Sequence, residues 1–213
     1  MTKQVKFSII IAISASIAMN SCGGGGNTEN KSNDVIISKT DDSKITESKI
    51  RQFFKIKQAT VVYDLLGGLK KETVYFDDYG AKMRIDENDF ITFFDEAAGN
   101  KVYRFDIANQ TYQEGVVKEL YFNRHQYLMP AVSDENAGVD ELTKSNETIA
   151  GKECIVYTAK TGKNISVFGG WNGISFFTKS NDNVIIRAVS FEETIPGNIF
   201  DLPKGYTKIT NNE

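Results

Sequence analysis

The chain has 213 residues, of which 40% are hydrophobic and 25% are charged, a composition typical of a globular protein rather than a disordered or multi-span membrane protein. The formal net charge is −3 and the lysines and arginines are scattered, so we expect no nucleic-acid partner. One His and two Cys leave few of the side chains from which metal sites and catalytic sites are built.

The first residues are typical of a secretory signal peptide. Lys3 and Lys6 precede an apolar run over residues 7–19, which is shorter than the roughly 20 residues that a spanning helix needs. Ser21 and Cys22 follow, an order that resembles a bacterial lipobox. The pattern predicts that residues 1–21 are removed and that Cys22 becomes the lipidated first residue, carrying palmitate-type acyl chains. The alternatives are an ordinary cleaved signal with Cys22 as a plain thiol, or a permanent transmembrane helix.

Residues 22–46 begin with the lipidated cysteine and four glycines and continue with Asn, Ser, Thr and Asp, a composition that predicts a flexible tether. We therefore expect a lipid anchor in the cell envelope, at the outer membrane and facing the periplasm. The membrane is the one partner that the sequence indicates, and a protein partner is left open. Two or more acyl chains anchor a protein stably, whereas a single chain does so only marginally.

Residues 47–213 are expected to form a single β-rich domain. Period-two alternation recurs between turns that contain Gly, Asn or Asp, for example over 81–86 and 102–107, which is typical of antiparallel strands. The residues from 118 to about 146 are polar and predict one or two short helical segments ending at Pro130. The expected fold class is mainly antiparallel β, as a curved sheet or incomplete β-barrel of nine or ten strands closed by those helices.

Four segments of this body resemble those of certain bacterial lipoproteins: Glu72–Gly80, Ile149–Tyr157, Trp171–Ile174 and Phe200–Tyr206. Those proteins are similar in architecture to the LolA/LolB lipoprotein-carrier fold, a half barrel wrapped on helices with an apolar cavity. The resemblance implies a structural framework and a cavity. It does not by itself transfer an activity or a cargo to this chain.

The sequence contains few residues that could form a catalytic site or a metal site. His125 has no second histidine with which to share a metal, and Cys154 lies within an alternating strand, where a thiol behaves as a small buried hydrophobe. The paired acids of residues 77–78 lack the donor spacing of a calcium loop. We expect no metal, no cofactor and no enzymatic activity, because no set of nucleophile, base and orienting residue is recognisable.

Two functions remain open from the sequence. In the first, the lipid-anchored body binds an acyl chain or another apolar ligand in a concave cavity of its sheet. The residues proposed to line that cavity are Met83, Ile85, Tyr103, Phe105 and Trp171. In the second, the core is filled and the protein is a non-enzymatic structural or interaction lipoprotein of the envelope, because patterning cannot distinguish a filled core from an empty one.

Overall fold

The computed structural model describes residues 52–117, 124–130 and 139–210, and its named strands form one sheet. The strands are β1 (Ala59–Leu65), β2 (Lys70–Asp77), β3 (Lys82–Asp86), β4 (Phe90–Asp95), β5 (Lys101–Asp106), β6 (Thr111–Val116), β7 (Glu141–Ile149), β8 (Lys152–Thr161), β9 (Asn164–Trp171), β10 (Ile174–Ser180), β11 (Asn183–Glu192) and β12 (Thr207–Lys208). Three short 3-10 turns accompany them, η1 (Leu66–Gly68), η2 (Asp78–Gly80) and η3 (Arg124–Tyr127).

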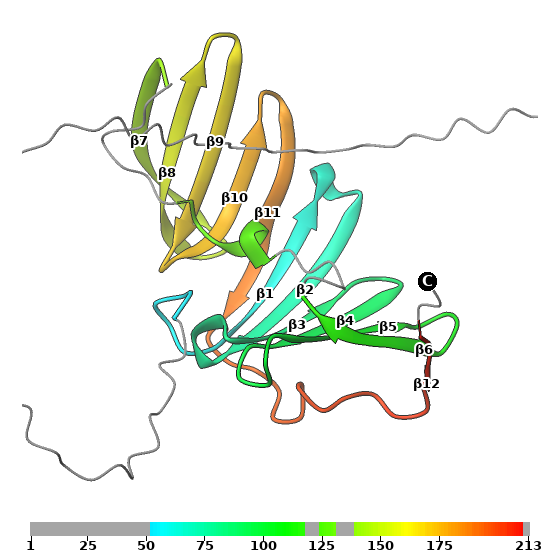
Figure 1. The fold of residues 1–213 in the computed structure, drawn as a ribbon. Coiled ribbons are helices and arrows are strands. Elements are labelled where there is room, and N and C mark those ends of the chain that lie inside the picture. The colour runs from blue at the N-terminus through cyan, green and yellow to red at the C-terminus, as the bar shows by residue number, and fades with distance from the viewer. Residues whose placement is uncertain (1–51, 118–123, 131–138, 211–213) are drawn as a thin grey trace, which may run out of the picture. The chain divides into compact units, whose positions relative to one another are not determined.

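The sheet has the order β12-β6-β5-β4-β3-β2-β1-β11-β10-β9-β8-β7 (Figure 1). Two antiparallel meanders, β1 to β6 and β7 to β11, are joined where β1 pairs with β11. All neighbours are antiparallel except β12, which runs parallel to β6. The prediction of a mainly antiparallel sheet is therefore confirmed, with twelve strands in place of nine or ten.

The prediction that helices close the sheet is wrong for the described residues. Within the described ranges the only helical elements are the three 3-10 turns, and the sheet is open. Of the stretch predicted to be partly helical, η3 is a single turn just before Pro130, and residues 118–123 and 131–138 lie outside the described ranges. No helix among the described residues has the length and apolar character needed to cross a membrane.

The same prediction missed strand β7, whose first six residues were assigned to the polar, partly helical stretch. β7 is the last strand at one edge of the sheet, and most of its residues are exposed on both faces. Such a strand shows no alternation of apolar and polar residues, so its sequence does not carry the usual strand pattern. Its charged residues Glu141, Lys144 and Glu147 are of the kind that discourage edge-to-edge association.

Tight turns fix the register of the hairpins. Asn172 and Gly173 connect β9 to β10 with φ values of 51° and 84°, the left-handed pair that a two-residue hairpin turn requires. Opposite Gly169 and Gly170, the pairing of β10 shifts between Ser175 and Phe177. The two glycines therefore lie opposite a bulge, where a residue without a side chain is often found.

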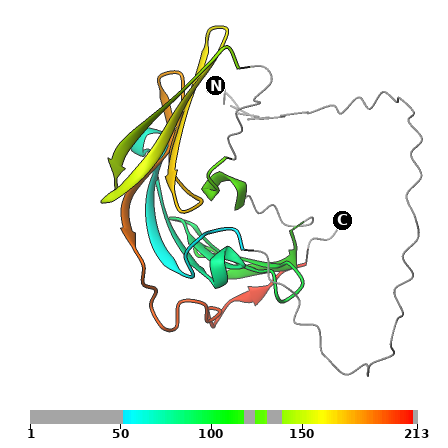
Figure 2. The ribbon, with the colours of Figure 1, turned by 90° about the vertical axis from the view of Figure 1, so that its left-hand side faces the viewer.

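Two short segments cover the concave side of the sheet. Phe54, from the segment before β1, packs on Phe76 with ring centroids 4.4 Å apart and is buried. Tyr127, at the end of η3, lies 5.5 Å from the ring of Tyr63 and is also buried. Figure 2 shows η3 inside the curve of the sheet. Each fully buried aromatic side chain contributes about 1.5–3 kcal/mol of burial free energy.

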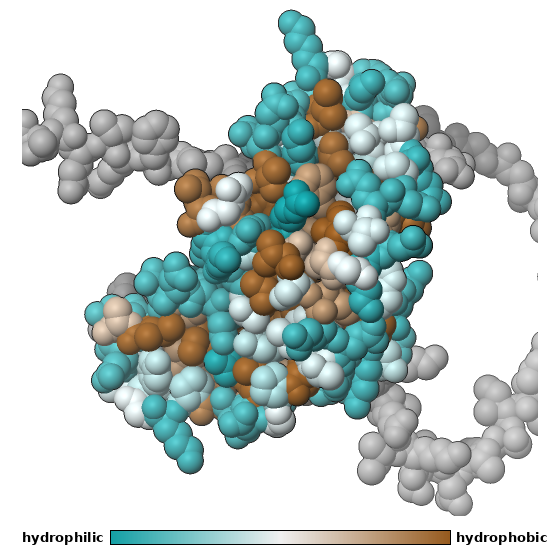
Figure 3. Space-filling model, turned by 180° about the vertical axis from the view of Figure 1, so that it is seen from behind, coloured by the Kyte–Doolittle hydropathy of each residue, from teal (hydrophilic) through white to brown (hydrophobic). Residues whose placement is uncertain are grey.

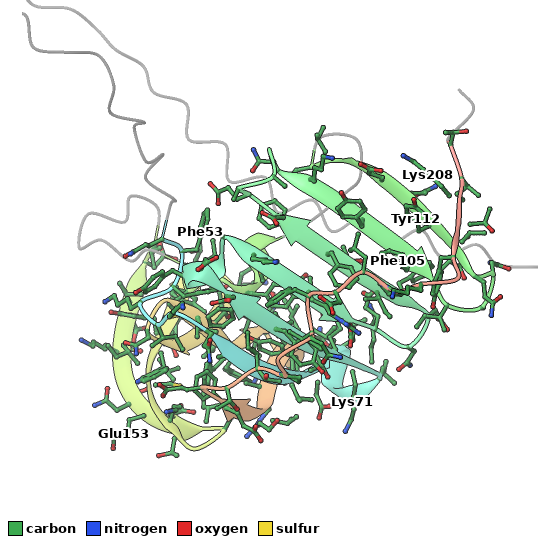
Figure 4. The ribbon with its side chains drawn as sticks, turned by 90° about the horizontal axis from the view of Figure 1, so that it is seen from below. Phe53, Lys71, Phe105, Tyr112, Glu153 and Lys208 are labelled. Atoms are coloured by element: carbon green, nitrogen blue, oxygen red, sulfur yellow. The ribbon has the colours of Figure 1, made fainter. Side chains whose placement is uncertain are left out.

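The opposite face of β2 to β5 is covered by the segment over residues 193–206, which we call the strap (Figure 4). Arg84 donates a 2.8 Å hydrogen bond from Nη1 to the carbonyl oxygen of Ile199. Tyr206 packs edge-on against Phe105 at 5.1 Å. The strap then continues into β12 and completes the sheet beside β6.

Candidate functional site

The concave face of β2 to β5 has one apolar end. Phe76, Met83, Phe94 and Val102 are successive cross-strand partners, so their side chains share one face. All four are at most 1% exposed and belong to one hydrophobic core that also contains Phe54 and Tyr127. This end of the concave face is therefore packed rather than hollow.

The next rows along the same strands become polar. Ile85, Thr92 and Arg104 are successive partners in the second row, and Arg104 pairs in turn with Gln113 of β6. In the third row, Glu72 lies opposite Tyr63 of β1. The concave face thus changes from hydrocarbon to charged groups within four residues along each strand.

A hydrogen-bonded cluster of charged residues lies at the boundary between these ends. Tyr127 donates a 2.6 Å hydrogen bond to Oε2 of Glu72, and Lys70 donates one of 2.9 Å to Oε1. Lys70 also donates to Glu87, which directly follows β3. Burial raises the pKa of Glu72 despite these donors. Burial acts in the same sense on Glu87, but the hydrogen bonds it makes with Lys70 and Glu72 and the nearby charges of Lys70 and Arg104 together outweigh burial and lower its pKa.

Two neighbouring carboxylates with opposite pKa shifts are a pattern that acid–base catalysts use. Here, however, both oxygens of Glu72 accept hydrogen bonds from the protein, and the residue is only 4% exposed. A general acid or base must reach a substrate atom, directly or through one water. These hydrogen bonds therefore hold η3 on the sheet through Tyr127, and we call the group of Lys70, Glu72 and Tyr127 the clamp.

An open hollow of about 200 Å³ lies beyond the clamp, near the β6 edge of the sheet. Its lining comes from β4, β5, β6 and the residue after β12: Phe90, Arg104, Asp106, Thr111, Tyr112, Gln113 and Ile209. The guanidinium of Arg104 lies over the Phe90 ring, with Cζ 4.2 Å from the centroid, and its Nε is buried without a hydrogen-bond partner. Hydrogen bonds from Asn109, to both carboxylate oxygens, lower the pKa of Asp106.

The five residues proposed to line an apolar cavity do not come together. Met83 and Ile85 lie on the concave face, at 0% and 7% exposure. Tyr103 and Phe105 pair with Phe93 and Ile91 and point to the opposite face, where the strap covers Phe105. Trp171 is in the other half of the sheet, at the end of β9, 5.4 Å from Phe191 and 4.4 Å from the Lys152 ammonium.

Of the two cysteines and the histidine singled out from the sequence, the structure describes the side chain of Cys154 alone. Cys154 is a buried free thiol whose pKa burial raises to about 11, in keeping with its expected structural role. Cys22 and the side chain of His125 lie outside the described residues. No group of three or more His, Cys, Asp or Glu that could hold a metal occurs in the described part of the chain.

Exposed apolar side chains occur on several elements, including Leu66 and Leu69 in the β1–β2 hairpin, at 54% and 87% exposure, and Val189 on β11. Figure 3, which shows the molecule from behind, has apolar groups interspersed with hydrophilic ones. Scattered exposure of this kind is normal for folded proteins and does not by itself mark a site.

Sequence reasoning missed the clamp and the hollow. Glu72, Arg104 and Gln113 lie at positions of alternating strands where charged and polar residues usually face water. The available signal was at Glu72, which has the same parity as the apolar residues Val74 and Phe76 of its own strand. A charged residue in phase with the buried positions is informative, because it must be paired or must face an opening.

Comparisons with known proteins report similarity of fold. No protein-family model and no curated protein matches the chain. Among solved structures, an uncharacterised conserved protein from Thermus thermophilus is 9% identical, with a TM-score of 0.45 over 72% of this chain and 90% of that one. PNGF-II is 10% identical, with TM-scores of 0.41 and 0.39 in two crystal forms; 72% of this chain matches 31% of that chain. At these scores we draw no functional conclusion from either protein.

Proposed function

We propose that this chain is a non-enzymatic interaction lipoprotein of the cell envelope, anchored through acylated Cys22 at the outer membrane and facing the periplasm. The observation that carries the proposal is the packed end of the concave face, where Met83, Phe94 and Val102 are at most 1% exposed. A body with a filled core acts through its surface. The surface feature best suited to contact a partner is the hollow at the β6 edge, because it combines charge, an aromatic ring and open access.

The alternative, binding of an acyl chain or other apolar ligand, draws support from the curvature of the sheet and from the resemblance to the LolA/LolB fold (Figure 2). The five residues proposed to line the cavity are separated in the structure, which argues against this alternative. Tyr103 and Phe105 face away from Met83 and Ile85, and no single ligand on the concave face contacts both pairs. We therefore place the interaction role first.

Anchoring and sorting are tested by labelling cells with radioactive palmitate and fractionating their membranes. The proposal expects label on the wild-type protein in the outer-membrane fraction and none on Cys22→Ser, which should be released from the membrane. Label on the variant, or a wild-type protein without label, would contradict lipid anchoring through Cys22.

The interaction role is tested by photo-crosslinking in intact envelopes. A photoreactive phenylalanine analogue at Thr111, which lines the hollow, is expected to give one discrete protein adduct. The matched control is the same analogue at Glu153, an exposed residue of β8 (Figure 4). Equal adducts from both positions, or none from either, would argue against the proposal. An acyl chain released from the native protein in a mass spectrometer would favour the ligand-binding alternative.

A further inference from the structure

We infer that the hollow at the β6 edge is a carboxylate-binding site in which Arg104 is the recognising residue. This inference rests on the proposed interaction role and names the chemical group that the hollow would recognise. Its basis is a cation that lines a hollow of sufficient volume and whose Nε has no hydrogen-bond partner.

The guanidinium of Arg104 has one hydrogen-bond donor without a partner. Its Nε is buried and has no hydrogen-bond partner, and within the described ranges no carboxylate forms an ion pair with it. A buried donor left unsatisfied destabilises the protein, and an acceptor supplied by a ligand would remove that penalty. The guanidinium presents its donors as a planar fork that matches the two oxygens of a carboxylate.

The neighbouring acids do not fill this role. Asp106 accepts hydrogen bonds from the backbone nitrogen and the side-chain amide of Asn109, at 2.9 and 2.8 Å. Glu87 accepts from Lys70. Each carboxylate near Arg104 thus has another donor and interacts with the arginine charge at a distance, while the Nε of Arg104 is left without a hydrogen-bond partner.

The cavity supplies the remaining features. Phe90 lies beneath the guanidinium at 4.2 Å and holds its plane, which reduces the entropy lost when an anion binds. The hollow, about 200 Å³, accommodates a carboxylate together with a few atoms of the molecule that bears it. Ile209 and the Phe90 ring provide apolar contact for those atoms, and Thr111 provides a hydroxyl. A carboxylate at the end of a peptide and the carboxylate of a small acid share this chemistry.

The test observes the Arg104 Nε–H signal in the nitrogen–proton NMR spectrum of the full-length wild-type protein. Acetate, N-acetyl-trialanine and the C-terminal amide of that peptide are titrated in turn. We expect a saturable shift of the Arg104 signal with acetate and with the free acid, and none with the amide. Tighter binding of the peptide acid than of acetate identifies a peptide end as the source, whereas equal binding identifies a small acid.

Variants give a second readout. Arg104→Gln is expected to lose at least tenfold in affinity for acetate, and Arg104→Lys several-fold, because an ammonium cannot make the two-pronged contact. Arg187→Gln removes the same charge from the exposed face of β11 and should bind as wild type does. Binding of the amide as strong as that of the acid, unchanged affinity in Arg104→Gln, or no saturable shift in wild type would overturn the inference.

The two proposals fail separately. Absence of carboxylate binding, with a discrete adduct from Thr111 in envelopes, would overturn the assignment of Arg104 and leave the interaction role standing. Carboxylate binding without any adduct would support the site and contradict the protein-interaction role.

Discussion

Replacing Tyr127 by Phe tests the clamp that holds η3 against the sheet. The substitution removes one hydroxyl and keeps the ring, so packing against Tyr63 at 5.5 Å is retained. The lost contact is the 2.6 Å hydrogen bond to Oε2 of Glu72, a residue only 4% exposed. Hydrogen bonds to charged groups contribute about 1.5–3 kcal/mol, and the carboxylate oxygen left behind has no access to bulk water.

We therefore expect Tyr127→Phe to lower the free energy of unfolding by about 1.5–3 kcal/mol. For a domain of this size the melting temperature should fall by about 3–12 °C. Urea and thermal unfolding of the purified protein, followed by circular dichroism, measure both quantities. Tyr157→Phe is the matched control, since Tyr157 is half-buried and packs against Phe168 at 5.8 Å. Equal stability of wild type and Tyr127→Phe, within about 0.5 kcal/mol, would refute the clamp.

Three other positions in the sheet carry predictions of their own. Gly170→Ala should lower the free energy of unfolding by about 3 kcal/mol or more, because the new Cβ would collide with the carbonyl oxygen of Ile174. Gly197→Ala is the control, since its Cβ meets no atom within 4 Å, and the urea midpoints of the two variants are compared. Cys154, whose pKa burial raises to about 11, should resist iodoacetamide at pH 8 in the native protein and react after unfolding, as mass spectrometry would report; rapid native alkylation would contradict its burial. Burial raises the folded-state pKa of Glu72 above its ordinary value of 4.5, so its contribution to stability is complete below that pH and declines as pH rises through the raised pKa. Glu72→Gln should flatten this decline in a series of unfolding curves, and an unchanged decline would exclude Glu72 as its source.

Much of the fold was predictable from local pattern. The hairpins follow from period-two alternation, as in β2 to β5, and from turn residues, such as Asn172 and Gly173 between β9 and β10. Turn chemistry depends on neighbours in the sequence, so it is readable there. The pairing of β1 with β11 was not readable, because it joins segments that are far apart in the chain and depends on which edges remain free after each meander has formed.

The candidate site was less predictable than the fold. Ile85 and Phe105 look alike in sequence, since each is an apolar residue of an alternating strand. Cross-strand register places Ile85 on the concave face and Phe105 beneath the strap. An alternating pattern predicts that one face is buried without indicating what covers it. Here one end of the concave face of β2 to β5 packs against Phe54 and Tyr127, and the strap covers the opposite face.

The sequence by itself determined the antiparallel class, the position of most strands and the expectation of an exported, lipid-anchored chain, because these depend on local periodicity and on short contiguous motifs. Only the tertiary structure decided that one end of the concave face is packed, that Glu72 meets Tyr127, and that Arg104 lines a hollow. The physical reason is that burial and hydrogen bonding are properties of pairs of segments. A residue that lies alone in its strand gains its partner, or lacks one, only when distant strands come into register.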